Sequence, residues 1–514
     1  MKIVIPMAGE GNRFREKGFK EIKPLIKIGN KPMIQHVIEM FPGEEDFVFI
    51  CQKKHLEDTK LKSVLKKLKP KSTIAAVEDA GKGPVHNFLR AEKYIPDNEE
   101  IIVNYCDFWM EWNYKDFLSK ARQGKYDGAL PAFRGFHPAS LGSTYYAYMR
   151  TDKNNNLLEI REKKSFSSNR MDDFASTGTH YFSSGKIAKK YAKELIGKNI
   201  NVNKESYFSL PFNLLVGDGL KALVYEVKKF LCFGTPRDVN QYMFWHDVFN
   251  KKMDIGKKIY DYTALIPAAG KGKRFSDSGH KIPKPLIKVD NEEMIVKSVK
   301  SLPKAKNYIF VCLEEQLKKG LEKSLKKNFS NCRIVSVKET TKGMANTCLL
   351  AKGLWDAKKP LLISACDYRL AYDIYKFNKL VNDKSVDVII WTFKNHECVM
   401  RNPNAYAYVA VDSNGFAAKI VEKSAISAKP GNDHAVVSVF WYRTADLFEE
   451  GAMKLLDAGI KVGGEYYVAT SINALIQSGK KVVPFEVEKF ICFGTPEDLQ
   501  EYNYWKGCFQ NQKQ

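Results

Sequence analysis

Near the N-terminus, a short apolar run passes into two glycines and then meets cationic side chains. Residues 2–7 are mostly apolar, Gly9 and Gly11 follow, and Arg13 and Lys23 come soon after. Glycines leave backbone N–H groups accessible and adopt positive φ, so such a loop can close around phosphate oxygens. The two cations would supply the countercharge. The chemistry indicated is phosphate binding, although a Gly-x-Gly turn alone is also typical of a plain tight turn.

The same stretch occurs a second time, 261 positions later, and further motifs recur 260 positions apart. The recurring pairs include Gly9/Gly270, Lys23/Lys284, Asp107/Asp367, Lys163/Lys423 and Gly234/Gly494. A nearly constant offset over the whole chain indicates a tandem duplication, and the period is too long for a solenoid repeat. We therefore predict one domain in residues 1–249, a linker in residues 250–261 and a second domain in residues 262–514.

Composition supports a globular, cytoplasmic protein. The chain has 514 residues, 44% hydrophobic and 27% charged, and each half is long enough to bury a core. No apolar run is long enough for a membrane span, and no signal-peptide pattern precedes the first strand. The ten cysteines contain no C-x-x-C pair, and three pairs of them recur inside apolar runs. This usage is typical of reduced, buried cysteines.

The net charge of +23 leaves two interpretations open. Lysines are spread along the chain, and the densest runs, at residues 60–71 and 317–327, have helical spacing of leucines. Solvated helix faces explain this pattern, whereas attraction for a polyanionic substrate or an anionic membrane surface is the alternative. Without a basic patch interleaved with aromatics, we predict no nucleic-acid partner. Homo-oligomerisation stays open.

The order of apolar runs predicts an α/β fold. In each copy, strands alternate with helices up to the strand that ends in Asp107 or Asp367, which favours a mostly parallel, doubly wound sheet. Ligands of such sheets bind beyond the carboxyl ends of the strands, where both glycine loops and both aspartates fall. The later strands, around residues 128–133, 144–149, 157–162 and 178–182, indicate a mixed sheet that would form an acceptor pocket.

At this point the motifs carry a family resemblance. Residues 6–14, followed by Lys23-Pro24-Leu25-Ile26, resemble the bacterial sugar-phosphate nucleotidyltransferases, whose fold is Rossmann-like and similar to that of GT-A glycosyltransferases. The resemblance extends through Asp107, Glu162-Lys163 and the Gly-Thr-Pro-x-Asp segment, and covers both copies. The first copy further resembles capsule-associated members assigned to cytidylyl transfer.

The resemblance implies an enzyme of the EC 2.7.7 type. An NTP, with CTP favoured and UTP or dTTP as alternatives, would transfer its NMP to a sugar phosphate or another small phosphorylated acceptor, and pyrophosphate would be released. The activated product would be a precursor of a capsule or another surface polysaccharide. The implied catalytic cations are Arg13, Lys23, Lys163, Arg274, Lys284 and Lys423. The implied nucleotide-binding residues are Met7, Ala8, Gly9, Gly11, Gly83, Ala268, Ala269, Gly270, Gly272 and Gly343. Glu162, Gly178 and Glu422 would contact the acceptor, and Asp107 and Asp367 would bind Mg²⁺.

The chain departs from the family pattern at three places. Cys232 and Cys492 stand where many relatives have a second metal-binding aspartate. The first copy has Ile22 where the second has the usual Pro283, and the second copy has Ser438 in place of Gly178.

Three hypotheses about the function are compatible with the sequence. Both copies are nucleotidyltransferases with different acceptors, one copy is a non-catalytic nucleotide-sensing or scaffold module, or the chain is a glycosyltransferase. A glycosyltransferase would be expected to carry an Asp-x-Asp motif at the strand end, and residues 107–109 and 367–369 lack the second aspartate. Different acceptors are predicted because residues 133–138 and 177–180 differ from residues 393–398 and 437–440.

Overall fold

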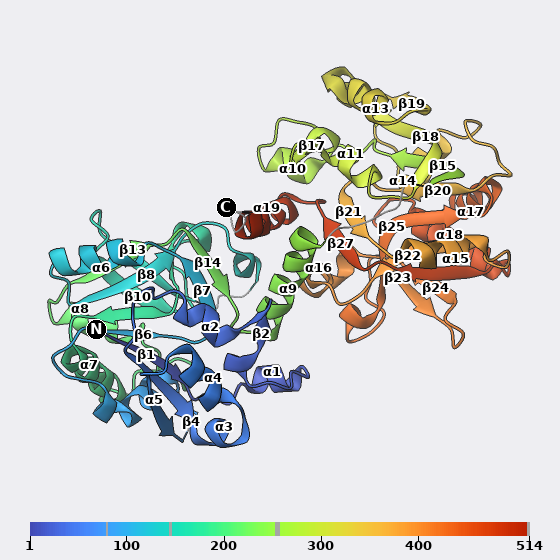
Figure 1. The fold of residues 1–514 in the computed structure, drawn as a ribbon. Helices are drawn as coiled ribbons and strands as arrows, with labels where there is room; N and C mark the ends of the chain where they lie inside the picture. Colours follow the sequence, from blue (N-terminus) through green and yellow to red (C-terminus); the bar gives the residue numbers. More distant parts are fainter. Residues whose placement is uncertain (79–80, 143–145, 252–257, 511–514) are drawn as a thin grey trace. The chain divides into compact units, whose positions relative to one another are not determined.

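The computed structural model describes residues 1–78, 81–142, 146–251 and 258–510, without the side chain of Gln510 (Figure 1). Two compact units divide the chain. The first unit comprises Met1–Asp247 and the residues from Cys508 onward, and the second unit comprises Val248–Gly507. Helix α9 (Pro236–Asn250) extends into the predicted linker 250–261, and strand β15 (Ile259–Pro267) begins inside it. Residues 252–257 of that predicted linker lie outside the described residues.

The first unit is built on a parallel sheet of four adjacent strands. Strand β1 (Lys2–Met7) pairs in parallel with β4 (Phe47–Gln52) on one side and β6 (Ile101–Asn104) on the other, and β4 pairs with β5 (Thr73–Val77). These strands are apolar on both faces because helices cover the sheet. The parallel order brings the carboxyl ends of β1 and β6 side by side, with the glycine loop after one and Asp107 after the other.

Beyond β6 the same sheet becomes mixed, as predicted. Strand β12 (Thr179–Phe182) pairs antiparallel with β6 and β8 (Gly128–Phe133), while β13 (Ala222–Glu226) pairs in parallel with β8. The sheet continues through β11 (Phe174–Ser176), β9 (Ala147–Thr151) and β10 (Leu157–Glu162). The predicted strand 144–149 lies partly outside the described residues.

The first copy contains helices α1 (Asn12–Glu16), α2 (Met33–Ile38), α3 (Lys53–Asp58), α4 (Leu61–Leu68), α5 (Pro84–Arg90), α6 (Tyr114–Gln123), α7 (Gly185–Gly197), α8 (Pro211–Gly217) and α9. Buried side chains of α2, α4 and α6 pack on one face of the sheet, and those of α5, α7 and α8 pack on the other. Two antiparallel ribbons, β2 (Lys27–Ile28) with β3 (Lys31–Pro32) and β7 (Phe108–Glu111) with β14 (Lys229–Cys232), complete the copy.

The second unit repeats the arrangement. Its parallel strands are β19 (Cys332–Val337), β18 (Lys304–Leu313), β15 and β20 (Leu361–Ser364), and its mixed part contains β25 (His434–Tyr442), β22 (Val388–Phe393), β26 (Val482–Glu486), β23 (Tyr408–Val411) and β24 (Ala417–Val421). The ribbons are β16 (Lys288–Val289) with β17 (Glu292–Glu293) and β21 (Tyr368–Ala371) with β27 (Lys489–Cys492). Its helices include α10 (Lys273–Asp277), α11 (Met294–Val299), α13 (Glu322–Asn328), α14 (Met344–Leu349), α15 (Ile374–Asn382), α16 (Glu397–Arg401), α17 (Ala445–Asp457), α18 (Val468–Gln477) and α19 (Pro496–Gln510). The predicted α/β class, with a parallel half and a mixed half in each copy, is confirmed.

Candidate active site

The glycine loops are shaped by a contact with the Lys-Pro-Leu turns. Gly11, at φ +68°, precedes α1, and a Cβ on it would lie 3.6 Å from the Cβ of Lys23. In the second unit, Gly272 has φ +64°, and its Cβ would lie 2.8 Å from that of Lys284. Glycine is needed here because the backbone is left-handed and the lysine packs against it. Arg13 and Arg274 project from α1 and α10 and are exposed.

The lysine after each loop forms an ion pair with the aspartate that follows the fourth parallel strand, β6 or β20. Lys23 Nζ donates to Asp107 Oδ2 at 2.6 Å, and Lys284 Nζ donates to Asp367 Oδ2 at the same distance. Burial alone lowers the pKa of the Lys23 ammonium, but the nearby carboxylate outweighs it, so the pKa is raised. The same holds for Lys284. Both lysines are therefore held charged at the carboxyl edge of the sheet.

The Gly-Thr-Pro turn is brought to this pair by the ribbon of β7 and β14. Cys232 pairs with Phe108, and Phe233 N–H donates to the carbonyl of Asp107 at 2.7 Å. A Cβ on Gly234 would lie 3.3 Å from both Asp107 Oδ2 and Cys232 Sγ, and 3.9 Å from Asp238 Oδ2. The bare glycine thus keeps the approach to Asp107 free of a side chain. Gly494 has the corresponding neighbours in the second unit.

Asp238 and Asp498 are carboxylates close to this edge that the sequence interpretation did not assign. Asp238 Oδ2 accepts from the backbone N–H of Thr235 at 2.8 Å and from its hydroxyl at 2.7 Å, and Thr235 Oγ1 accepts from the Asp238 N–H, so the two residues form a reciprocal capping arrangement at the start of α9. The thiol of Cys232 also donates to it, at 3.6 Å. Both aspartates belong to the Gly-Thr-Pro-x-Asp segment, which occurs in both copies. This repetition in the sequence could have identified them as candidate site residues.

The donor set fits Mg²⁺ held by a single carboxylate. Burial raises the pKa of the Cys232 thiol, which keeps it protonated, and Asp238 Oδ2 is already occupied by its cap. Within the described ranges, no group of three or more His, Cys, Asp or Glu side chains is arranged to hold a metal. Mg²⁺ is commonly bound through one or two carboxylates together with phosphates and water. Asp107 and Asp367 are compatible with such a site.

Glu162 ends β10 and Glu422 directly follows β24, and the lysine after each glutamate has a left-handed backbone. Lys163 and Lys423 have φ +57° and +52°, values uncommon for residues with side chains and frequent at functional sites. Lys163 Nζ donates to the Tyr207 hydroxyl at 3.0 Å. Burial raises the pKa of that hydroxyl, as does Glu205, whereas Arg13 lowers it. Tyr207 therefore lies within electrostatic reach of both Lys163 and the glycine-loop arginine.

The two glutamates have different surroundings. Glu162 Oε1 accepts a hydrogen bond from the hydroxyl of Ser209. Burial raises the pKa of the Glu162 carboxyl. Burial also raises the pKa of the Glu422 carboxyl, to about 7, and Lys423 only partly offsets it. Among the described residues, Glu422 Oε2 has no hydrogen-bond partner and is buried.

Gly83 and Gly343 are placed by close backbone contacts. A Cβ on Gly83, at φ +95°, would lie 2.8 Å from the backbone N and O of Ser206. A Cβ on Gly343, at φ +116°, would lie 2.5 Å from those of Tyr466. These glycines join the loop before α5 or α14 to the segment that carries Tyr207 or Tyr467. The structure therefore gives them a definite packing role.

Gly178 and Ser438 differ for a reason that the structure reveals. Gly178 has φ +98°, and a Cβ on it would lie 2.9 Å from Tyr105 Cδ2. Ser438 keeps a left-handed backbone, at φ +65°, and Ala365 stands where the first copy has Tyr105. Both residues use their carbonyl to accept the N–H of residue 105 or 365 at 3.1 Å. The serine is accommodated because the aromatic ring is missing.

The segments 133–138 and 393–398, which were predicted to differ in acceptor binding, are more similar than their alignment at a 260-residue offset suggests. His137 Nδ1 accepts from the N–H of Ala139, and His396 Nδ1 accepts from the N–H of Cys398, both at 3.2 Å. A one-residue shift thus conceals an equivalent histidine. Thr179 and His180 are 0% and 1% exposed. They are core residues and do not line a pocket, so the difference between residues 177–180 and 437–440 gives no support for different acceptors at these two positions.

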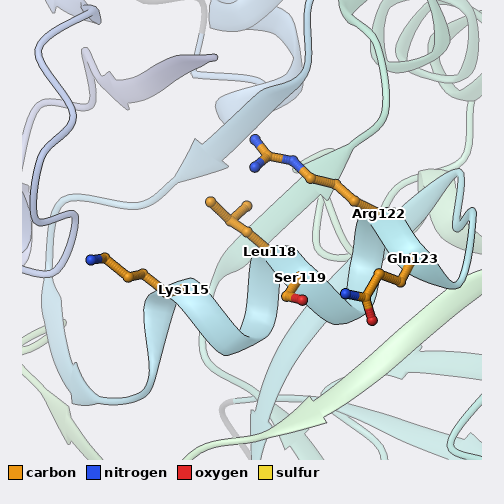
Figure 2. Close-up of a pocket in the computed structure, with 5 residues that line it drawn as sticks. All are labelled: Lys115, Leu118, Ser119, Arg122 and Gln123. Carbon is orange, nitrogen blue, oxygen red and sulfur yellow. The ribbon is translucent and has the colours of Figure 1, made fainter.

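One surface hollow involves none of the predicted site residues. Its lining comes from α6, where Lys115, Leu118, Ser119, Arg122 and Gln123 project from one helix (Figure 2).

Within the described part of the chain, no helix is both long and apolar enough to pass through a bilayer.

Comparisons with known proteins support the repeat. The family described as nucleotidyl transferase matches residues 2–224 and again residues 263–480. The bifunctional protein GlmU of Methanocaldococcus jannaschii is 28% identical over 163 residues, which are 32% of this chain and 36% of the relative. Glucose-1-phosphate cytidylyltransferase of Salmonella typhimurium is 24% identical over 131 residues, 21% of this chain and 50% of the relative. The chain thus spans about a third to a half of these curated relatives' lengths.

Among solved structures, the nucleoside-diphosphate-sugar pyrophosphorylase of Vibrio cholerae has a TM-score of 0.40 at 19% identity, covering 47% of this chain and 99% of that one. The inositol-1-phosphate CTP transferase of T. maritima has a TM-score of 0.39 at 15% identity, covering 49% of this chain and 98% of that one.

Proposed function

The chain belongs to the nucleotidyl transferase family, and we propose that each of its two units transfers a nucleoside monophosphate from an NTP to a phosphorylated acceptor. An oxygen of the acceptor's phosphate attacks the α-phosphorus, a new P–O bond forms, and the bond to the β-phosphate oxygen breaks. Pyrophosphate leaves. The observation that carries the proposal is the lysine–aspartate pair, 2.6 Å long, formed beside a glycine loop in both units.

The proposed roles follow from charge and position. The glycine loops bind the triphosphate with their backbone N–H groups, and Arg13 and Arg274 neutralise its outer phosphates. Lys23 and Lys284 lie at the sheet edge and stabilise charge that grows at the α-phosphate during transfer. Lys163 and Lys423 bind the acceptor's phosphate, beside Glu162 and Glu422. No covalent enzyme intermediate is required, so catalysis comes from positioning and charge neutralisation.

Asp107 and Asp367 would hold Mg²⁺ together with substrate phosphates and water. The ion would neutralise triphosphate charge and polarise the α-phosphate.

The proposed substrates follow from the activity named for one of the relatives. The match to a glucose-1-phosphate cytidylyltransferase favours CTP as donor and a sugar phosphate as acceptor, with UTP and dTTP as alternatives. Products of this kind are activated precursors, and the proposed destination is a capsule or another surface polysaccharide.

The test uses the full chain and pyrophosphate release. CTP, UTP, dTTP, GTP and ATP are first compared by thermal shift with Mg²⁺, because a tight ligand raises stability by mass action. The best NTP is then assayed with a panel of sugar 1-phosphates, phospho-alditols and phosphorylated amines. Lys23→Ala and Lys284→Ala should each lower turnover at one site by about 10²–10³. The double variant should be inactive.

Exposed lysines of the same segments provide matched controls. Lys27 and Lys288 follow the catalytic lysines by four residues and are exposed. Lys27→Ala and Lys288→Ala should retain activity. Near-normal turnover in the Lys23→Ala, Lys284→Ala double variant would refute the assignment. Activity that depends on one lysine alone would instead indicate that one copy is a non-catalytic module.

A further inference from the structure

A glutamine fastens the glycine loop of the second unit to the neighbouring strand. Strands β15 and β18 run in parallel, so the loop after β15 lies beside the turn after β18, where helix α12 (Glu314–Gln316) begins. Gln316 Nε2 donates to the carbonyl of Gly270 at 3.0 Å, and its Oε1 accepts from the backbone N–H of Leu313 at 3.1 Å. Gln316 is 1% exposed. One buried amide therefore joins the proposed triphosphate loop to the end of the strand beside it.

In the first unit, a histidine occupies this position. His55 precedes Gln316 by 261 residues, the same offset that relates Gly9 to Gly270. It lies in α3, directly after β4, and β4 pairs in parallel with β1, so the imidazole belongs to the edge of the sheet that carries the glycine loop. His55 is 8% exposed, and its Nδ1 is buried without a hydrogen-bond partner among the described residues. A buried polar atom left unpaired costs about 1–3 kcal/mol and calls for a specific explanation.

Charged side chains of the loop and of α3 act on this imidazole. Burial lowers its pKa, and Arg15 and Lys54 lower it further. Glu10 and Asp58 act in the opposite direction and raise the pKa. Glu10 lies between the two glycines of the loop, and Arg15 Nη2 donates to Glu10 Oε2 at 3.0 Å. His55 is therefore within electrostatic reach of the glycine loop itself.

We propose that His55 is the positioning residue of the first unit's glycine loop, and that its Nδ1–H donates to the Gly9 carbonyl when the loop binds a triphosphate, as Gln316 donates to Gly270. A neutral imidazole carries one N–H donor and one acceptor nitrogen, so it can replace an amide in this role. The inference rests on the proposed function, because it concerns the loop that binds the NTP.

The histidine also makes NTP binding by the first unit depend on pH. A triphosphate in the loop brings negative charge close to His55, which favours the imidazolium form. The imidazolium is also the stronger hydrogen-bond donor. The first unit should therefore bind an NTP more tightly as the pH falls. Gln316 gains no proton, so the second unit is a reference for the protonation of the NTP itself.

The experiment measures the KM for the NTP that gives the largest thermal shift, using the full chain with one unit silenced. Lys284→Ala isolates the first unit, in which His55→Leu is compared with His55→Gln. Leucine fills a similar volume without a donor, whereas glutamine reproduces the second unit. In His55→Leu the KM for the NTP should rise roughly 2- to 12-fold, the worth of one hydrogen bond, with little change in kcat. His55→Gln should keep a KM close to that of the parent at about pH 8, where the imidazole is neutral.

The reverse exchange in the second unit, isolated by Lys23→Ala, keeps the test decisive if the His55 variants do not fold. Gln316→Leu should raise the KM for the NTP by a similar factor, and Gln316→His should add a pH dependence. Glu57 and Lys318 occupy corresponding exposed positions of the same two segments. Glu57→Ala and Lys318→Ala should leave the KM for the NTP unchanged.

The pH profile separates positioning from a merely structural role. Between about pH 6 and pH 8, the ratio of the first unit's KM to the second unit's KM should fall as the pH falls, and His55→Gln should make this ratio constant. Equal KM values in His55→Leu and His55→Gln, or a ratio that does not change with pH in the parent, overturn the inference and leave the proposed function intact. If the parent chain shows no thermal shift with any NTP and releases no pyrophosphate, the proposed function fails first, and the inference fails with it.

Discussion

Replacing Glu422 with glutamine is expected to stabilise the second unit at pH 8 and to change its stability little at pH 4.5. Burial raises the pKa of this carboxyl from an ordinary 4.5 to about 7, and nothing described in the chain donates to Glu422 Oε2. The folded protein therefore binds a proton more tightly than the unfolded chain does. The stability associated with the protonated form is complete below pH 4.5 and is lost as the pH rises through 7.

The magnitude follows from the two pKa values. Each pKa unit is worth about 1.4 kcal/mol, so the ionised carboxylate costs at most roughly 3–4 kcal/mol above pH 7. Partial exposure of the glutamate to solvent reduces this, and we expect a gain of about 1–3 kcal/mol for Glu422→Gln at pH 8. Glutamine is neutral at every pH, so the gain should grow between pH 4.5 and pH 7.

Hydrogen exchange read by mass spectrometry is the appropriate assay, because peptides report each unit separately in the full chain. Peptides covering β24 and β25 should become more protected in Glu422→Gln at pH 8, after correction for intrinsic exchange rates. The matched control is Glu162→Gln, which should gain less because Ser209 already donates to that carboxylate. Equal gains in the two variants, or a gain that does not depend on pH, would refute the reasoning.

The remaining predictions concern the metal, the backbone and the acceptors. Asp107→Asn should abolish Mg²⁺-dependent turnover of the first unit and leave nucleotide binding by the second unchanged in titrations, whereas joint loss would show that the sites are coupled. Gly178→Ala should destabilise the first unit by about 1–3 kcal/mol in hydrogen exchange, because its φ is +98° and the new Cβ would meet Tyr105; Ser438→Ala should be nearly neutral, since that position already carries a Cβ. Full chains carrying Lys23→Ala or Lys284→Ala should use different acceptors in pyrophosphate assays, and identical acceptor profiles would contradict the prediction made from the differences between the two copies.

The duplication, the α/β class and the recurring polar residues were predictable because they depend on local patterns. A strand followed by glycines and a cation predicts a phosphate-binding loop from the local sequence alone, without knowledge of the rest of the fold. Two copies at a constant offset also make chance recurrence of the whole set of motifs improbable. The histidines show the limit of this approach, since a one-residue shift hides the equivalence of His137 and His396, which cap their turns in the same way.

The repetition of a parallel α/β unit, and the position of the glycine loops, Asp107 and Asp367 at one edge of each sheet, could be predicted from local sequence patterns. The ion pairs that Lys23 and Lys284 form with these aspartates are visible only in the folded chain. Asp238 proved to be a capping residue beside Asp107, and Glu422 proved to be buried without the donor that Glu162 has. Hydrogen bonding between residues far apart in sequence depends on packing distances of a few ångströms, and those distances are set by the fold as a whole.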